Sequence, residues 1–206
     1  MRTRVKICGI TRLDCLLEAV QRGVDALGFN MYSKSPRFIE VDQAKSLVSR
    51  VPGFVTSVGL FVNESAEVVR KKSDQIGFDL LQFHGDESNE FCRQFDRPFI
   101  KVLRIKETSD MGKINDFPDA KSFLFDAHVE GKFGGTGQRI AADIASAMPA
   151  DGILAGGLDP NNVAEAIEAL RPFAVDVSSG VEVNTGVKDP QLLASFFQAV
   201  QSADRR

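Results

Sequence analysis

The sequence lacks tryptophan and contains only one tyrosine, two histidines and three cysteines. Cys8, Cys15 and Cys92 are an odd number without the short paired spacing of a zinc ligand set. The histidines, His84 and His128, lie on separate segments without His-x-x-x-His spacing. We therefore expect no metal site, and the cysteine usage indicates a reducing, cytoplasmic location.

Long hydrophobic runs and an excess of positive charge are also missing. The most apolar stretch, residues 54–62, is far shorter than the roughly 20 residues that cross a membrane. The basic start, residues 1–6, is followed by Arg12 and Asp14 where a signal peptide would have its apolar core. The net charge of −3, with both signs dispersed, argues against nucleic acid and membrane as partners.

What is present is an ordinary globular balance, with 43% hydrophobic and 26% charged residues in a chain of 206. Short apolar runs alternate with amphipathic helical patterns along the chain. The expected strands are residues 5–8, 26–30, 56–62, 80–83, 99–104, 122–126, 152–154 and 174–177. Their nearly continuous apolar character is typical of strands covered on both faces.

Several helix starts carry capping signals, because short polar side chains stand just before the helical patterns. Two of them precede a proline, which is well tolerated in a first helical turn. The expected caps are Thr11, Ser65, Asp86, Asp159 and Asp189.

Eight alternations of strand and helix imply parallel strands, either in a closed barrel or in an open doubly wound sheet. A (β/α)8 TIM barrel needs about 200 residues at its smallest. We expect a minimal barrel of this kind, with residues 1–206 as one catalytic domain, because eight units leave no residues over. An open sheet usually has fewer strands.

Active sites of such barrels lie at the carboxyl ends of the strands, where polar and glycine-rich residues gather in this sequence. Gly156-Gly157 follows the seventh expected strand and Ser179-Gly180 the eighth, which are the usual positions for a bound phosphate. Gly135, in a further glycine-rich segment, can add an N–H donor. The alternative is that these glycines only allow the chain to turn and bind no ligand.

Two residues at strand ends have the chemistry of a base and an acid. Cys8 precedes an expected helix, whose positive end can lower the pKa of the thiol and favour the thiolate. Asp126 follows an apolar strand, and a carboxyl against such neighbours can stay protonated and act as a general acid. A buried inert cysteine and a turn-capping aspartate are the alternatives.

Further polar side chains complete a ring at the same end of the barrel. Arg37 can pair with a substrate carboxylate. Asp176 either contacts the ligand or braces the turn that follows it. The remaining candidates for substrate contacts are Gln82, His84 and Arg104.

Five segments resemble, in order and across essentially the whole chain, the motifs of phosphoribosylanthranilate isomerases. The first and last are specific when taken together. The segments are residues 6–11 (KICGIT), 82–87 (QFHGDE), 134–137 (GGTG), 155–158 (AGGL) and 176–182 (DVSSGVE). Gln138-Arg139 departs from the pattern, because many members have a lysine there.

The resemblance implies a cytoplasmic, cofactor-free barrel enzyme of tryptophan, and so aromatic amino-acid, biosynthesis. This aldose–ketose isomerase, an intramolecular oxidoreductase, performs an Amadori rearrangement. N-(5-phosphoribosyl)anthranilate becomes 1-(2-carboxyphenylamino)-1-deoxyribulose 5-phosphate. The partner implied is this small phosphorylated sugar–anthranilate conjugate, and members occur as monomers or homodimers.

The resemblance also implies roles for individual residues. Cys8 is the general base and Asp126 the general acid. Arg37 binds the anthranilate carboxylate. The phosphate contacts implied are Gly157, Ser179 and Gly180.

Three other functions share parts of this pattern. A related phosphate-sugar isomerase, such as the ribosyl-formimino isomerase of histidine biosynthesis, pairs two aspartates, and Cys8 stands against it. A non-catalytic sensor of a phosphorylated metabolite does not need both Cys8 and Asp126. A metal-dependent epimerase needs more histidines than this chain has.

Overall fold

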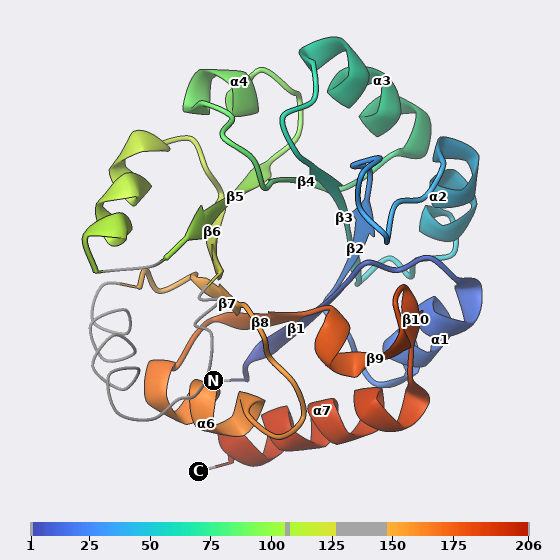
Figure 1. Cartoon of the computed structure of the whole chain (residues 1–206), viewed down its shortest axis with the longest axis vertical. Helices are drawn as coiled ribbons and strands as arrows, with labels where there is room; N and C mark the ends of the chain where they lie inside the picture. The colour runs from blue at the N-terminus through green and yellow to red at the C-terminus, as the bar shows by residue number, and fades with distance from the viewer. Residues whose placement is uncertain (1, 106–107, 127–147, 206) are drawn as a thin grey trace.

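The structure is a computed structural model that describes residues 2–105, 108–126 and 148–205. Within these ranges, eight parallel strands close into a barrel in sequence order, with β8 pairing to β1. Figure 1 shows the ring of strands surrounded by helices. The predicted (β/α)8 barrel is therefore confirmed.

The strands lie where the apolar runs placed them, to within one residue. Those that form the barrel are β1 Arg4–Cys8, β2 Ala26–Asn30, β3 Thr56–Phe61, β4 Leu80–Phe83, β5 Phe99–Arg104, β6 Ser122–Asp126, β7 Ile153–Ala155 and β8 Ala174–Val177. Continuous apolar runs locate these strands well because helices cover the outer face while side chains fill the inside.

Helices follow most of the strands, as predicted. They are α1 Leu13–Gln21, α2 Val41–Val48, α3 Ala66–Ile76, α4 Asn89–Arg93, α6 Val163–Leu170 and α7 Pro190–Asp204. After β5 the chain forms a 3-10 helix, η1 Thr108–Asp116, where an ordinary helix was expected. The helix expected after β6 falls on residues 127–147, outside the described part of the chain.

Two of the predicted helix caps are confirmed. The side chain of Asp189 accepts hydrogen bonds from the backbone N–H groups of Gln191 and Leu192, ahead of a proline at the start of α7. The hydroxyl of Ser65 accepts one from Val68 N–H at the start of α3.

The other predicted caps are wrong. Ser88, two residues after Asp86, caps α4. The carboxylate of Asp159 accepts from the N–H groups of Asn161 and Asn162, in a turn that precedes α6 rather than at its cap position. Short polar side chains accept bonds in turns as readily as in caps, so their presence alone does not distinguish the two.

Thr11 serves a structural contact that the sequence did not reveal. Its hydroxyl donates to the carbonyl of Gly186, 2.6 Å away, between β9 (Glu182–Asn184) and β10 (Val187–Lys188). These two strands form an antiparallel hairpin inserted between β8 and α7. The hairpin carries Glu182 and Lys188, which enter the site described below.

Apolar side chains pack both outside and inside the ring of strands. Outward side chains of the strands pack against the helices in the largest cluster, which includes Phe29, Phe61 and Phe83. A smaller cluster of Ile100, Val102, Leu124, Ile153, Ala155 and Ala174 fills the barrel interior. This apolar cluster fills the barrel below the carboxyl ends of the strands, and Leu124 and Ala155 of the cluster also line the pocket described below.

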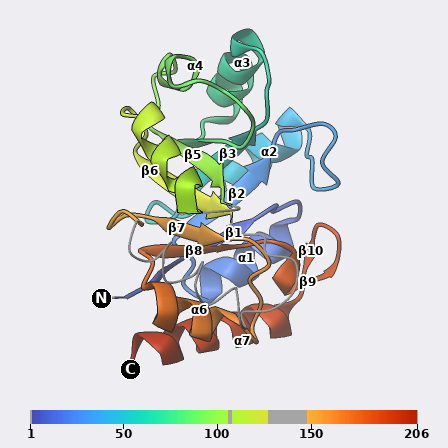
Figure 2. The ribbon, with the colours of Figure 1, turned by 60° about the vertical axis from the view of Figure 1, so that its left-hand side comes forward.

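The end of α7 lies close to the start of β1, and α7 lies beside α6 in both ribbon views (Figures 1 and 2). The backbone N–H of Thr3 donates to Asp204 at 2.9 Å. None of the helices in the described ranges has the length and apolar character needed to span a membrane.

The cap of α7 gives a test of this fold. Replacing Asp189 with alanine removes two hydrogen bonds and is expected to lower the free energy of unfolding by about 1–2 kcal/mol. Ser65→Ala removes one bond of 3.3 Å and is expected to cost about 0.5 kcal/mol. Urea unfolding followed by circular dichroism measures both free energies of unfolding. An equal or larger decrease for Ser65→Ala would contradict the assignment of Asp189 as the stronger cap.

Candidate active site

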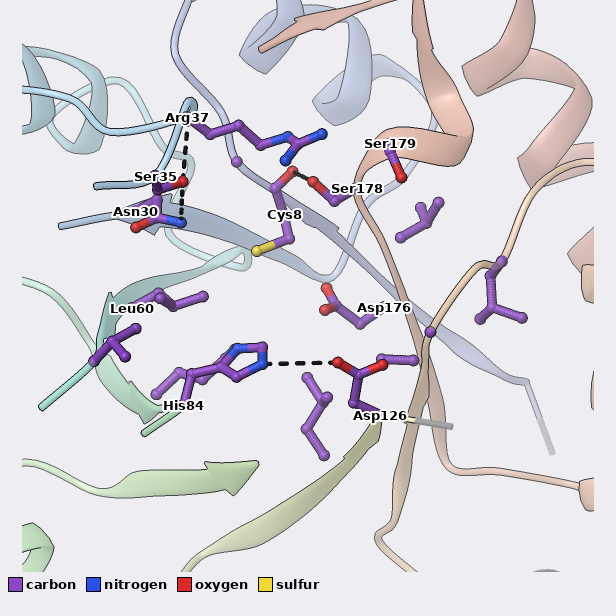
Figure 3. Close-up of a pocket in the computed structure, with 18 of the residues that line it drawn as sticks. Cys8, Asn30, Ser35, Arg37, Leu60, His84, Asp126, Asp176, Ser178 and Ser179 are labelled. Atoms are coloured by element: carbon purple, nitrogen blue, oxygen red, sulfur yellow. Dashed lines mark hydrogen bonds and ion pairs between the residues drawn. The ribbon is translucent and has the colours of Figure 1, made fainter. Parts of the chain in front are cut away.

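A pocket of about 480 Å³ opens at the carboxyl ends of the strands, within the size range of small-molecule sites (Figure 3). It brings together most of the residues that the sequence singled out. Those lining it are Cys8, Arg37, Gln82, His84, Arg104, Asp126, Gly156, Gly157, Asp176 and Ser179. Gly180 is not a lining residue, and Gly135 lies outside the described residues.

Cys8 ends β1, and its sulfur points into the pocket (Figure 3). Burial raises the pKa of its thiol, while the charges of Lys6 and Lys188 act in the opposite direction. The prediction of a lowered pKa was therefore wrong. Helix α1 begins only at Leu13, so its positive end is too far along the chain to offset desolvation.

Below Cys8, a buried ion pair joins β1 to β8. Lys6 Nζ lies 2.8 Å from Asp176 Oδ1, and their side chains are 4% and 10% exposed. Burial alone would lower the pKa of Lys6, but the charge of Asp176 and its hydrogen bond raise it above the ordinary value. Lys6 is therefore a firmly charged ammonium inside the barrel.

Asp126 ends β6 and faces His84, which follows β4 on another wall of the pocket (Figure 3). His84 Nε2 lies 3.7 Å from Asp126 Oδ2, and each side chain is about a quarter exposed. The sequence predicted both residues but not their pairing. Asp126 is thus open to a ligand in the pocket, unlike the buried pair beneath Cys8.

Arg37 has a carboxylate partner within the chain. Its Nε and Nη2 donate to the two oxygens of Glu182, at 2.8 and 2.7 Å. Lys188 Nζ lies 2.7 Å from the same carboxylate and also donates to the carbonyls of Cys8 and Ser178. Burial alone would raise the pKa of Glu182, but the hydrogen bonds from Arg37 and Lys188 hold it below its usual range.

The two glycine-rich turns lie against each other. Gly156 and Gly157 have φ angles of 99° and 64°, which favour glycine, and Asn162 donates to the Gly157 carbonyl. A methyl group added to Gly180 would lie 1.9 Å from the carbonyl oxygen of Leu158. Glycine at position 180 therefore lets the turn after β8 approach the turn after β7.

Gln82 and Arg104 occupy the wall formed by β4 and β5. Gln82 is 1% exposed, and its Oε1 has no hydrogen-bond partner among the described residues. Arg104 is exposed and donates weakly to the carbonyl of His84, at 3.4 Å. Gln82 therefore lines the pocket and carries a buried acceptor that the described residues leave unpaired.

Sequence reasoning gave no role to three charged residues of this site: Lys6, Glu182 and Lys188. The sequence pattern could have identified Lys6, because alternation along a strand puts residues 6 and 8 on the same face of the strand. Glu182 and Lys188 lie on the unpredicted hairpin. No group of three or more His, Cys, Asp or Glu side chains placed to hold a metal occurs in the described part of the chain.

The chain is similar to known proteins over nearly its whole length. Residues 5–199 match the family model described as N-(5'phosphoribosyl)anthranilate (PRA) isomerase. The N-(5'-phosphoribosyl)anthranilate isomerase of Dechloromonas aromatica (strain RCB) is 45% identical over 205 residues, with 99% of each chain covered.

Solved structures of phosphoribosyl anthranilate isomerases have the same fold. The phosphoribosyl anthranilate isomerase of Thermotoga maritima superposes with a TM-score of 0.87 and 35% identity, covering 97% of this chain and 99% of that one. A crystal structure of phosphoribosyl anthranilate isomerase in complex with reduced 1-(o-carboxyphenylamino)-1-deoxyribulose 5-phosphate gives a TM-score of 0.86 with the same identity and coverage.

The thiols provide a test of the site geometry. Iodoacetamide at pH 9 is expected to modify Cys8, which lines the pocket, before Cys92, which is fully buried with a pKa raised by burial to about 12. Trypsin places Cys8, Cys15 and Cys92 in separate peptides, residues 7–12, 13–22 and 73–93, so mass spectrometry resolves them. Equal labelling in urea is the control, and faster native labelling of Cys92 would refute the described geometry.

Proposed function

Because this chain belongs to the phosphoribosylanthranilate isomerase family, we propose that Cys8 is the general base and Asp126 the general acid of its reaction. The enzyme converts N-(5-phosphoribosyl)anthranilate to 1-(2-carboxyphenylamino)-1-deoxyribulose 5-phosphate in tryptophan biosynthesis. The observation that supports these roles is that one pocket exposes a thiol from β1 and a carboxyl from β6.

Asp126 acts first in this scheme. In its protonated form it gives its proton to the furanose ring oxygen, and the bond from that oxygen to C1 of the ribose breaks. The nitrogen lone pair of the anthranilate forms an iminium with C1, and Asp126 is left as a carboxylate. His84, 3.7 Å from that carboxylate, is placed to stabilise the charge that develops there.

Cys8 acts second. The iminium acidifies the C2 proton of the ribose, and the thiolate of Cys8 removes it, which gives an enolamine and a neutral thiol. The enolamine gains a proton at C1 and loses the C2 hydroxyl proton, so that C2 becomes the ketone. Positioned proton transfers of this kind typically contribute about 10²- to 10⁴-fold each.

The raised pKa of Cys8 has a consequence for this scheme. In the free enzyme burial raises the pKa of Cys8 and so favours the thiol over the thiolate. Lys6 and Lys188 oppose burial, and the iminium adds a further positive charge beside the sulfur. The Cys8 thiolate is therefore more stable once the iminium has formed, which is when it is needed to remove the C2 proton.

We assign the substrate phosphate to the two glycine-rich turns. Gly156 and Gly157 let the backbone approach an anion without Cβ atoms in the way. Ser179 and Gly180 begin the 3-10 turn η2, Ser179–Val181, whose first N–H groups have no acceptor within the turn. Both turns meet at one end of the pocket. The expected contribution of Gly135 stays a prediction.

The anthranilate carboxylate is assigned to Arg37. Glu182 occupies Nε and one N–H of Nη2, which leaves Nη1 and the second Nη2 hydrogen for a ligand. Because Lys188 anchors Glu182, the guanidinium is held in one orientation before the substrate arrives. Glu182 thus positions the residue that binds the carboxylate.

The remaining predicted contacts concern the sugar. Gln82 offers an unpartnered acceptor, and Asp176 lines the pocket although it is paired with Lys6. Arg104 stands at the rim. We propose that residues 1–206 work as one catalytic barrel in the cytoplasm, where reducing conditions keep Cys8 as a free thiol.

Conservative replacement of the acid and the base tests the central proposal. Cys8→Ser and Asp126→Asn are each expected to lower kcat by about 10²- to 10⁴-fold, because each removes one positioned proton transfer. The decay of phosphoribosylanthranilate fluorescence, with the substrate made in situ, measures turnover, and the absence of tryptophan keeps the protein background low.

Product binding and a third variant complete this experiment. Both variants are expected to bind the product with nearly normal affinity. Cys92→Ala, which alters a thiol outside the pocket, is expected to keep the normal kcat. Weak binding with unchanged kcat in Cys8→Ser or Asp126→Asn would refute the assigned roles.

The carboxylate site has its own test. Arg37→Met is expected to raise KM for the natural substrate roughly 10- to 100-fold, because a charge-assisted hydrogen bond is lost. Glu182→Gln is expected to raise KM less, since the arginine stays but loses its anchor. The control substrate is the phosphoribosyl derivative of aniline, which has no carboxylate. An equal rise in KM for that substrate would show that Arg37 does not recognise the carboxylate.

A further inference from the structure

Lys6 is a charged side chain in the barrel interior, directly below the pocket. It is only 3% exposed, and an isolated ammonium in such a place would lose its proton rather than remain charged. Asp176 prevents this through the 2.8 Å ion pair from the neighbouring strand. The fold thus maintains a positive charge at a place where burying an apolar side chain would cost less free energy.

The ammonium of Lys6 lies next to the sulfur of Cys8. Both side chains project from the inner face of β1 over Gly28 of β2. A methyl group added to Gly28 would lie 2.9 Å from Cys8 Sγ and 3.2 Å from Lys6 Nζ. The missing side chain at position 28 therefore leaves room that the thiol and the ammonium share.

The other two cations near Cys8 share one carboxylate. Lys188 on β10 and Arg37 after β2 both pair with Glu182. Asp176 on β8 is the anion nearest to Lys6, and the β2 residue opposite Cys8 is Gly28, which carries no charge. Lys188 and Arg37 thus divide a single carboxylate between them, whereas Lys6 has a carboxylate of its own and lies with the thiol over Gly28.

We propose that Lys6 is a positioning residue of the isomerase, whose ammonium is the counter-ion of the Cys8 thiolate and is held in place by Asp176. The inference rests on the proposed function, in which Cys8 is the base. When Cys8 is a thiol, the ammonium pairs with Asp176 alone. When the thiol loses its proton, the ammonium serves two anions and keeps its own proton.

Opposite effects are expected from removing the two charges. Lys6→Met removes the cation, so the thiolate becomes less stable and the pKa of Cys8 rises further. Asp176→Asn removes the competing anion, and the Cys8 thiolate is then the anion that keeps the Lys6 ammonium charged, so the same pKa falls. A purely structural role would make the two variants behave alike, because each breaks the same ion pair.

The experiment measures the rate at which iodoacetamide modifies Cys8 in the folded, substrate-free chain at several pH values, by mass spectrometry of its tryptic peptide. At pH 9, Lys6→Met is expected to react about tenfold more slowly than the parent chain, and Asp176→Asn several-fold faster. Lys6→Arg keeps the charge and is expected to restore most of the parent rate.

Lys101→Met is the matched control. It breaks the other buried lysine–carboxylate pair, in which Lys101 Nζ lies 2.9 Å from Glu87 Oε2, outside the pocket. This variant is expected to lose stability without changing the rate at Cys8. Where Lys6→Met does not fold, as judged by circular dichroism, the comparison rests on Asp176→Asn and Lys6→Arg.

An unchanged rate in folded Lys6→Met, or a slower rate in Asp176→Asn, would overturn the counter-ion role. The readout needs no turnover, so it is separate from the proposed function. Full activity of Cys8→Ser would end the base assignment whatever the alkylation rates are. If both assignments hold, the pH profile of kcat/KM in Lys6→Met moves to higher pH together with the alkylation profile.

Discussion

The pairing of the last strand with the first is the constraint on which the site depends. Register between β1 and β8 sets Lys6 opposite Asp176, so that closing the barrel also forms the buried ion pair beneath Cys8. Ser178, just past β8, donates its hydroxyl hydrogen to the Cys8 carbonyl. The thiol is therefore positioned by residues about 170 places away in the chain, and barrel closure is a condition for chemistry as well as for stability.

The site uses carboxylates to hold cations as well as to act on substrate. Glu182 orients Arg37 and binds Lys188, while Asp176 keeps Lys6 charged. Burying these charges costs free energy that apolar residues would not cost, so such pairs are weak evidence for stability. Their value here is geometric, because they hold a guanidinium oriented toward the pocket and an ammonium fixed beside the thiol, and neither has to rearrange when a ligand binds.

Features that depend on local pattern were predicted well, and features that depend on a distant partner were not. The strands were placed to within one residue because burial on both faces leaves an apolar run. Asp86 has the same side-chain chemistry as Asp189, yet only Asp189 caps a helix. For Cys8, desolvation outweighs a helix end that begins five residues later, so the local argument predicted the wrong direction for its pKa.

By itself, the sequence determined that this chain forms a parallel barrel with a polar carboxyl end and that Cys8 and Asp126 stand at that end. Periodicity and strand order suffice for this, since parallel strands bring their carboxyl ends to one edge. Only the tertiary structure decided which charges meet there. Arg37 and Glu182 are 145 residues apart, and their contact follows from barrel closure and from a hairpin without a local signal. Hydrogen bonds and ion pairs act over a few ångströms, so they select partners only after the backbone has brought them together.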